Sequence, residues 1–373
     1  MSSPIEGFVA KGFEPVRAAF EQNFAEGLEI GAGFAAMIDG EPIVNLWGGH
    51  TDKTRTKPWT KDTIVPVHST TKPIAALIVA MQVQARRLAY DLPVAHYWPE
   101  FGDDGKDQVT VAQALSHQAG VPGFVERIDP DLWMDPPALM AALATQKPLW
   151  TPGTACGYHA MTYGYIAAAL VERVSGRTIG TILREDICEP LGIDFHVGLP
   201  DDQHGRCAIE QLPSSLPEFG EINEPRRVAF FVPWATPRRI DDRWRRAEMP
   251  STNGHGNALS VAQLFGAYAN EGKIGDLRLV DPQVFEELIV ERINGDDLVM
   301  PYRMSWAAGV MRNNNKIYGP NPRTLAHAGR GGSFGLGDPD KGLSAGYVMN
   351  KLAPALQTDE RAQRLITALY DCL

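Results

Sequence analysis

The stretch Thr63-Ile-Val-Pro-Val-His-Ser-Thr-Thr-Lys-Pro-Ile-Ala-Ala-Leu-Ile78 places Ser69 between an extended run and the start of a helix. A lysine three residues after such a serine comes round the first turn onto the same face, where the amine of Lys72 can reach Ser69 Oγ. The free amide groups and the positive end of the helix dipole then lie beside the oxygen as it becomes an alkoxide. This stretch therefore predicts that Ser69 is a nucleophile and that Lys72 activates it.

The Ser-x-x-Lys spacing is a weak signal when it stands alone. The chain has 12 serines and 11 lysines among 373 residues, so this spacing arises by chance in about one such chain in three. An unperturbed lysine, with a pKa of about 10.4, is also a poor base at neutral pH. Burial or a neighbouring positive charge must therefore lower the pKa of Lys72.

The composition is that of an ordinary globular protein, with 44% hydrophobic and 21% charged residues. The chain has 45 acidic and 35 basic residues, and the net charge of −10 disfavours a polyanionic partner such as nucleic acid. Cys156, Cys188, Cys207 and Cys372 form no CxxC pair and no spacing with histidine that is typical of a metal site. We expect free thiols in a reducing compartment.

The sequence indicates neither a signal peptide nor a membrane span. The first residues lack a basic segment followed by an apolar one, and the longest apolar stretch, residues 73–81, is far below membrane-spanning length. We expect a soluble cytoplasmic protein with no membrane partner. None of the nine histidines has the HExxH spacing or a similar one, so no metal is expected.

Hydrophobic periodicity divides the chain into sheet-forming ends and a helical middle. Residues 4–28 have apolar residues at helical spacing, which predicts an amphipathic helix. Residues 31–49 predict two strands around Asp39-Gly40, which supplies the positive φ angles of a tight hairpin. Helices are predicted at 73–87, 110–117, 136–146 and 159–174. Strands are predicted again at 306–311, 324–327 and 344–350, followed by a helix at 359–370.

The order of these elements and motifs resembles the family of serine β-lactamases, penicillin-binding proteins and family VIII carboxylesterases. The resemblance runs through most of the chain, and three motifs carry it besides its overall order. They are Ser69-Thr-Thr-Lys72, the stretch Leu115-Ser-His-Gln-Ala-Gly120, which looks like the family's LLSHTSG turn, and Pro152-Gly-Thr154 leading into Tyr158. The resemblance implies the serine β-lactamase/DD-peptidase-like fold, a mixed α/β (α+β) structure with an antiparallel sheet flanked by helices and a mostly helical domain.

The expected organisation is a discontinuous α/β sheet domain, residues 1–72 and 257–373, with a mainly α-helical domain, residues 73–256, between its two parts. Residues 196–256 have many prolines and little clean periodicity, so we expect long loops near the site. The active site would lie at the junction of the two domains.

The second motif of that family is Tyr-x-Asn, and its counterpart here is Tyr158-His159-Ala160. The tyrosine is kept and the asparagine is not. A phenol, with a pKa of about 10, becomes a useful base if cationic Lys72 stabilises its phenolate or if the two groups pass one proton between them. The resemblance therefore assigns Tyr158 a catalytic role, and His159 is a candidate substrate-binding residue.

The third motif of the family, Lys-Thr-Gly on a strand that lines the site, resembles His327-Ala328-Gly329. His327 and Gly329 are thus expected to bind substrate, but a mostly neutral imidazole and an alanine would hold a β-lactam carboxylate less well than lysine and threonine do. By the same resemblance, the oxyanion hole would consist of the backbone N–H groups of Ser69 and Arg330.

Two other motifs point elsewhere and are set aside. Gly331-Gly-Ser333-Phe-Gly335 matches the G-x-S-x-G elbow of α/β-hydrolases, but that fold needs a histidine after the serine, and the last histidine of the chain is His327. We expect a glycine-rich loop or strand edge there. The arginine cluster of residues 238–246 contains two aspartates, so we expect a solvated loop or a pocket rim instead of a nucleic-acid site.

The sequence thus predicts a carboxylesterase that hydrolyses short-chain acyl esters through a Ser69 acyl-enzyme, without a cofactor, and leaves the oligomeric state open. A small-molecule ester is the expected partner. Alternatives on the same scaffold are a β-lactamase, a D-amino acid amidase or peptidase, a transesterase, and a non-catalytic penicillin-binding type of module.

Overall fold

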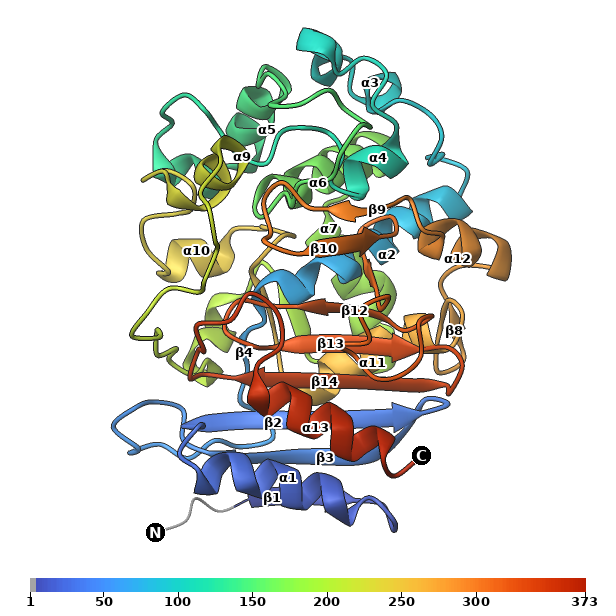
Figure 1. The fold of residues 1–373 in the computed structure, drawn as a ribbon. Coiled ribbons are helices and arrows are strands. Elements are labelled where there is room, and N and C mark those ends of the chain that lie inside the picture. Colours follow the sequence, from blue (N-terminus) through green and yellow to red (C-terminus); the bar gives the residue numbers. More distant parts are fainter. Residues whose placement is uncertain (1–4) are drawn as a thin grey trace.

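A nine-stranded antiparallel sheet forms the centre of the computed structural model, which describes residues 5–373 (Figure 1). The strand order is β1-β3-β2-β14-β13-β12-β11-β10-β9, so the two ends of the chain build one sheet, joined where β14 pairs with β2. The strands are β1 (Ile5–Val9), β2 (Gly31–Ile38), β3 (Glu41–Gly49), β9 (Ile293–Asp296), β10 (Arg303–Trp306), β11 (Met311–Arg312), β12 (Leu325–Ala328), β13 (Phe334–Asp338) and β14 (Leu343–Met349). This arrangement confirms the predicted fold class.

The hairpin between β2 and β3 turns at Asp39 and Gly40, as the sequence predicts. Both residues have positive φ angles, of 51° and 84°, which suit the right-handed twist of the flanking strands. In the sheet, the two strands lie between β1 and β14.

The prediction of one helix over residues 4–28 was wrong in its first part. Residue 4 lies outside the described residues, residues 5–9 form β1 on the edge of the sheet, and the helix α1 spans Glu14–Ala25. Gly7 and Gly12 both have a φ of 95°, which a helix does not accommodate, and a proline then begins α1. The apolar residues before Gly12 therefore pair with β3.

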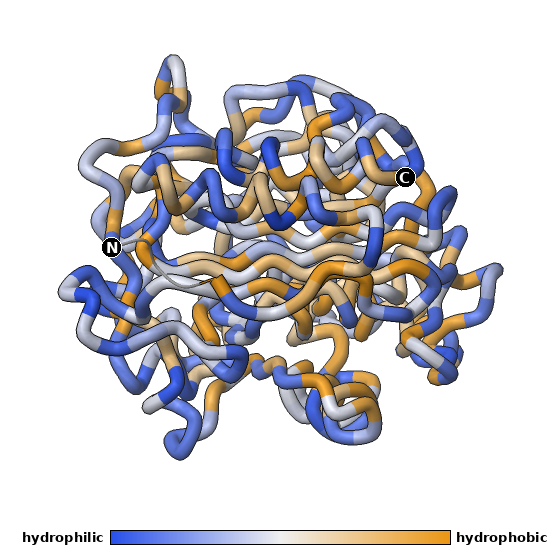
Figure 2. The backbone as a smooth tube through the Cα atoms, turned by 90° about the horizontal axis from the view of Figure 1, so that it is seen from below, coloured by the Kyte–Doolittle hydropathy of each residue, from blue (hydrophilic) through white to orange (hydrophobic). Residues whose placement is uncertain are grey.

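Helices cover both faces of the sheet. α1 packs against the C-terminal helix α13 (Glu360–Tyr370) on one face, and α11 (Ala258–Ala269) packs on β2, β13 and β14 on the other (Figure 1). The approach of α11 is so close that a Cβ at Gly335 or Gly346 would collide with it. Figure 2 shows hydrophobic segments gathered in these inner strands and helices, while the outer loops are mostly hydrophilic.

The predicted helices of the middle region are present. α2 (Lys72–Gln84) is buried along most of its length and packs on α6 (Thr162–Ser175) and α12 (Pro282–Ile289), so its first turn lies in a dry environment. The remaining helices are α3 (Val94–Tyr97), α4 (Val111–Leu115), α5 (Pro136–Ala144), α7 (Ile179–Ile182), α8 (Glu189–Leu191), α9 (Glu224–Arg226) and α10 (Asp242–Arg246). Whether this region is a separate domain with the predicted boundaries stays a prediction.

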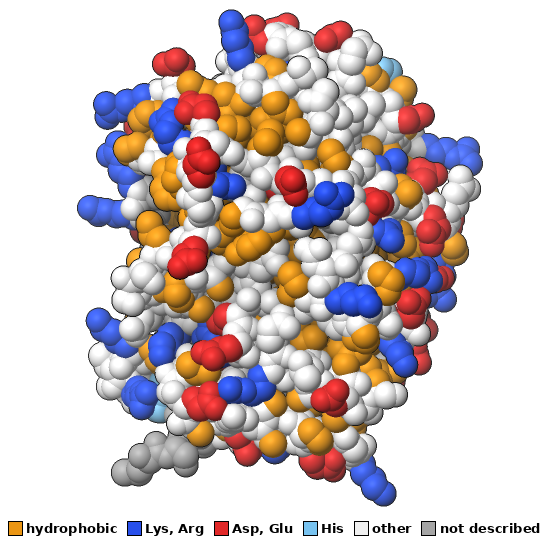
Figure 3. Space-filling view, viewed as in Figure 1, with side chains coloured by type: hydrophobic (Ala, Val, Ile, Leu, Met, Phe, Trp, Pro, Cys, Tyr) orange, Lys and Arg blue, Asp and Glu red, His pale blue; other side chains and the backbone are white. Residues whose placement is uncertain are grey.

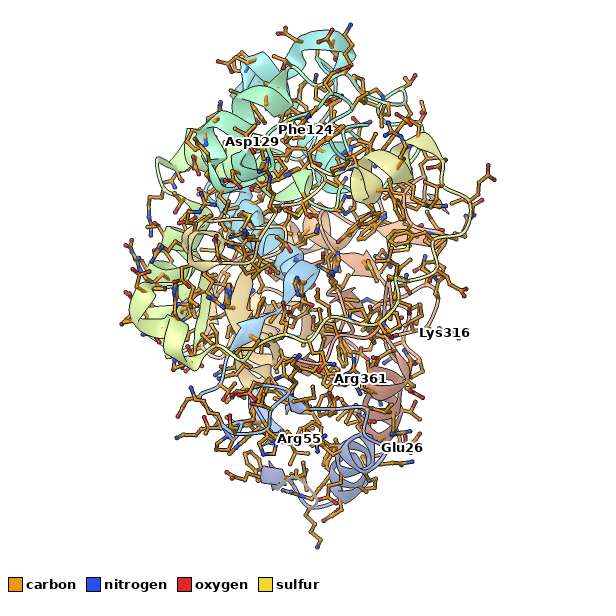
Figure 4. The ribbon with its side chains drawn as sticks, turned by 90° about the vertical axis from the view of Figure 1, so that its left-hand side faces the viewer. Glu26, Arg55, Phe124, Asp129, Lys316 and Arg361 are labelled. Carbon is orange, nitrogen blue, oxygen red and sulfur yellow. The ribbon has the colours of Figure 1, made fainter. Side chains whose placement is uncertain are left out.

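The segment 196–256 is mostly loop, with short helices and strands. A three-stranded sheet joins β4 (Val65–Pro66) through β6 (Gly254–Gly256) to β5 (Phe195–Val197), and a small hairpin pairs β7 (Lys273–Ile274) with β8 (Leu277–Arg278). Trp234 Nε1 donates to Phe124 O at 2.9 Å, which ties the loop to the helical region that Figure 4 marks with Phe124 and Asp129. The loop is therefore anchored over the site.

The predicted strand at 306–311 was wrong. β10 ends at Trp306, β11 begins at Met311, and the residues between them form a turn in which Ala307 N–H donates to Val310 O at 3.0 Å. Gly309, with a φ of 94°, permits that turn. The strands predicted at 324–327 and 344–350 are present as β12 and β14.

No helix within residues 5–373 is long and apolar enough to cross a membrane. All four cysteines are free thiols.

Candidate active site

Ser69 lies in a short 3-10 helix, η1 (His68–Thr71), that leads directly into α2. This turn is held from several sides, because Val67 N–H donates to Gly254 O at 2.8 Å and Thr71 Oγ1 donates to His68 O at 2.6 Å. The side chain of Ser69 is half-buried and faces a cavity. The local structure matches the strand-to-helix junction that the sequence predicts.

The amine of Lys72 is fully buried, since the residue has an exposed fraction of 0%, and three oxygen atoms lie within hydrogen-bonding distance of it. Nζ lies 3.2 Å from Ser69 Oγ, 2.8 Å from Ala160 O and 2.9 Å from Ser251 O. Burial lowers the pKa of Lys72 well below its usual value. A neutral amine has two N–H groups, which the two carbonyls can accept, and its lone pair is then left for the Ser69 hydroxyl proton.

Tyr158 lies over the same amine. Nζ of Lys72 is 4.8 Å from the centroid of the Tyr158 ring, and the ring of Trp306 stacks on Tyr158 with an interplanar angle of 10°. Burial raises the pKa of the Tyr158 phenol, and hydrogen bonding with Ser69 partly opposes that shift. The structure thus brings Ser69, Lys72 and Tyr158 together.

Two backbone N–H groups border the cavity where an oxyanion would develop. Ser69 is the second residue of η1, so its N–H has no acceptor within the helix, and the N–H of Arg330 donates to no backbone carbonyl of residues 5–373. Both residues line the cavity. The side chain of Arg330 is exposed, and Gly331 and Gly332 follow it with φ angles of 86° and 114°.

His327 and Gly329 also line the cavity, from β12 and the residue after it. Nδ1 of His327 lies 2.7 Å from Ala328 O and donates to it, so Nε2 carries the lone pair, and no protein group in the described part of the chain binds it. Burial lowers the pKa of His327 to about 3. At Gly329 a Cβ would collide with Val67 O and Ser333 Oγ, so a glycine is needed for packing.

The structure does not bring His159 to the cavity. Its ring has no exposed surface, Nδ1 lies 2.6 Å from Gly157 O, and Nε2 accepts the N–H of Val121 at 3.0 Å. Burial lowers its pKa to about 4. This corrects the expectation that His159 binds substrate, because both ring nitrogens are used by the backbone.

Ser333, the serine of the elbow-like motif, has a structural position. It is buried between β12 and β13, and its hydroxyl donates to Val67 O at 2.9 Å. This bond fixes the loop after β12 against the turn that carries Ser69. The sequence predicted a glycine-rich loop or strand edge, and the structure shows the loop that joins β12 to β13.

Several residues that position the site were missed by the sequence analysis. Asp297 Oδ1 accepts the N–H groups of Tyr158, Val299 and Met300 at 2.8–2.9 Å. His117 Nδ1 accepts the N–H of His159 at 3.1 Å, and its ring packs on Tyr158. Asp297 lies in no motif, His117 lies in the stretch 115–120 but was given no role there, and Ser251 acts through its backbone carbonyl, which any residue supplies.

The cavity has a volume of about 340 Å³ and is lined mainly by apolar side chains. The segment 213–244 supplies much of this lining, as the sequence predicts for loops near the site. Three of its hydrophobic residues are both part of the lining and exposed, namely Leu216 at 71%, Phe231 at 38% and Ile240 at 43%. Figure 3 shows exposed hydrophobic side chains over the region of α9 and α10.

Comparison with known proteins agrees with this geometry. The family model described as Beta-lactamase matches residues 18–369. The Esterase/beta-lactamase LipL of Mycobacterium tuberculosis is 30% identical over 364 residues, which cover 93% of this chain and 83% of that protein.

Solved structures are similar over the whole length. A penicillin-binding protein homologue from Caulobacter crescentus is 50% identical, with a TM-score of 0.97 over 99% of this chain and 100% of that one. A family VIII carboxylesterase is 40% identical, with a TM-score of 0.93 over the same shares of the two chains. This chain therefore belongs to the beta-lactamase family and is a serine hydrolase.

Proposed function

We propose that the protein is a carboxylesterase that forms an acyl-enzyme on Ser69. The observation that carries the proposal is the environment of the Lys72 amine. Two carbonyl oxygens, of Ala160 and Ser251, face its N–H groups, and the third direction points at Ser69 Oγ 3.2 Å away. A buried neutral amine held in this way is a base aimed at one hydroxyl.

Acylation then follows from the positions of these groups. Lys72, with Tyr158, takes the Ser69 proton as Oγ attacks the ester carbonyl carbon, and the backbone N–H groups of Ser69 and Arg330 stabilise the oxyanion. The proton passes to the alkoxide as the carbon–oxygen bond of the ester breaks. The alcohol leaves, and the acyl group stays on Ser69 until water removes it.

The lining of the cavity supports a neutral ester as the substrate. His327, at the position of the family's lysine, is kept neutral by burial, and Ala328 has no hydroxyl, so neither attracts a carboxylate. The cavity volume of about 340 Å³ is near the lower end of the range of small-molecule sites, about 300–1,000 Å³. The cavity must hold both the acyl part and the alcohol part of the ester. This supports a short acyl group.

The proposal is tested by initial rates on p-nitrophenyl butyrate and on nitrocefin, with Ser69→Ala as the blank. We expect a larger kcat/KM for the ester, and a decline along a p-nitrophenyl series from butyrate to laurate. A larger kcat/KM for nitrocefin would overturn the preference for esters. Ester hydrolysis that persists in Ser69→Ala would overturn the nucleophile.

A further inference from the structure

A histidine and a glutamate beside the nucleophile have no part in the acylation step. His68 directly precedes Ser69 and lines the same cavity. Its Nε2 lies 2.6 Å from Oε1 of Glu210, and the two side chains are only 5% and 9% exposed. A short contact between nearly buried ionisable groups at this position calls for a chemical explanation.

The contact defines which ring nitrogen is available. A carboxylate only accepts hydrogen bonds, so Nε2 carries the proton and donates it to Glu210. Nδ1 is then the ring nitrogen that is left to exchange a proton, and no hydrogen bond to Nδ1 is formed by residues 5–373. His68 and Ser69 line the same cavity, so a water molecule in that cavity is the proton donor that we consider for Nδ1.

Both members of the pair are held firmly. Glu210 lies between two backbone hydrogen bonds, since Ile209 N–H donates to Thr51 O and Gln211 N–H donates to Asn350 O, each at 2.7 Å. His68 has a φ of 50°, a left-handed conformation that few residues other than glycine adopt, although histidine, asparagine and aspartate adopt it more often than the rest. Such backbone strain persists only where the surroundings fix it, and it is often found at functional sites.

We propose that His68, oriented by Glu210, is the general base that activates water for hydrolysis of the Ser69 acyl-enzyme. This inference rests on the proposed function, because it concerns the second half of the same reaction. It assigns the two half-reactions to different bases, with Lys72 and Tyr158 serving acylation.

Hydrolysis of the acyl-enzyme takes place in two stages. Nδ1 of His68 takes one proton from water while the water oxygen forms a bond to the acyl carbon, and Glu210 stabilises the imidazolium. The bond between that carbon and Ser69 Oγ then breaks, its electron pair stays on Oγ, and the proton returns from Nδ1 to Oγ. The products are the free acid, Ser69 with its hydroxyl restored, and neutral His68.

The test compares His68→Asn and Glu210→Gln with the wild type. Asparagine tolerates a positive φ, so His68→Asn removes the imidazole while keeping the backbone conformation. His96→Asn, an exposed position on α3, is the matched control. Two quantities are measured: the rate at which a fluorophosphonate labels Ser69, and burst and steady-state rates on p-nitrophenyl butyrate.

For His68→Asn we expect labelling within twofold of the wild type, a steady-state rate reduced about 100-fold, and a burst of about one p-nitrophenol per enzyme. The acyl-enzyme should then be visible by intact-protein mass spectrometry. Glu210→Gln should show the same pattern with a smaller loss. An unchanged steady-state rate, or labelling that falls in parallel with turnover, would overturn the inference. A wild-type protein that is not labelled at Ser69 would overturn the proposed function and this inference with it.

Discussion

The amine of Lys72 and the hydroxyl of Ser69 lie 3.2 Å apart at a point where Lys72 has no exposed surface. This relationship converts an ordinary cation into a base, because burial favours the uncharged amine. The backbone carbonyls of Ala160 and Ser251 hold the amine without adding a negative charge that would restore its proton. Two measurable consequences follow, one for activity and one for stability.

Activity should fall as the pH drops through the lowered pKa of Lys72, because the protonated amine cannot accept the Ser69 proton. The acid limb of kcat/KM for p-nitrophenyl butyrate reports this ionisation in the free enzyme. Lys72→Met and Lys72→Arg should both lose about 1,000-fold in kcat/KM, since neither side chain is a base at neutral pH. Activity of Lys72→Arg near that of the wild type would show that a fixed positive charge, not a base, is needed.

The same ionisation of Lys72 should make the stability of the protein, like its activity, increase with pH. The unfolded chain binds a proton at Lys72 that the folded protein releases, so this residue makes wild-type stability rise with pH up to about 10.4, the usual pKa of lysine. The Tm of the wild type relative to Lys72→Met should therefore increase between pH 7 and pH 10. Thermal scans of both proteins across this interval test the sign, and a constant difference would mean that Lys72 stays protonated in the folded state.

Removal of the Tyr158 hydroxyl should slow acylation with little effect on folding. Tyr158→Phe keeps the stacking on Trp306 but removes the hydroxyl that, in the proposed mechanism, shares the Ser69 proton with Lys72. We expect kcat to fall about 100-fold, with KM changed little. Tyr318→Phe is the matched control, because the Tyr318 hydroxyl is buried and has no partner within the described residues. An equal decrease of kcat in Tyr158→Phe and Tyr318→Phe would show that the Tyr158 hydroxyl has no specific role in acylation.

Asp297 should matter for the position of Tyr158. Its Oδ1 accepts three backbone N–H groups, including that of Tyr158, so Asp297→Ala leaves buried donors without partners. We expect a loss of about 3 kcal/mol in the free energy of unfolding, measured by urea denaturation, together with a lower kcat. Asp297→Asn keeps an oxygen acceptor and should lose less of both. A normal kcat in Asp297→Ala would show that Asp297 does not position Tyr158 for catalysis.

The parts of the site that could be predicted from sequence are those fixed by local geometry. One turn of helix brings Ser69 and Lys72 together. The hairpin at Asp39-Gly40 is determined by the positive φ angles of these two residues. The chain order of motifs added Tyr158 through a family resemblance. These features need no knowledge of how distant segments pack.

The parts that were missed depend on long-range contacts. Asp297 lies 139 positions from Tyr158, Glu210 lies 142 from His68, and Ser251 lies 179 from Lys72. No periodicity in the sequence relates residues so far apart. A backbone carbonyl that accepts a hydrogen bond cannot be recognised from the residue type, because every residue has one. His159 was misplaced for the same reason, because its partners come from the turn around Val121. Near the N-terminus, Phe8 and Val9 fit the hydrophobic period of a helix as well as that of a strand. They form a strand because they pair with β3.

Arg361 on α13 should link the stability of the sheet face to the loop that carries Arg330. It forms ion pairs with Glu29 at 3.0 Å and with Asp359 at 2.6 Å, and it donates to Gly331 O at 2.9 Å. Figure 4 shows Arg361 on the sheet side of the molecule, close to the end of α1 marked by Glu26. Burial raises the pKa of Glu29 to about 7, although Arg361 opposes that shift.

Arg361→Met should therefore cost about 3–5 kcal/mol in the free energy of unfolding, because it leaves Glu29 buried without a cation. The loss should be smaller at pH 5 than at pH 8, since removing the cation raises the pKa of Glu29 further and the protonated carboxyl needs no partner. Glu29→Gln with Arg361→Met should recover part of the stability, as measured by urea denaturation. If kcat on p-nitrophenyl butyrate stays low in this double variant while stability returns, the bond to Gly331 is what positions the oxyanion N–H of Arg330. Recovery of both together would instead assign Arg361 to folding alone.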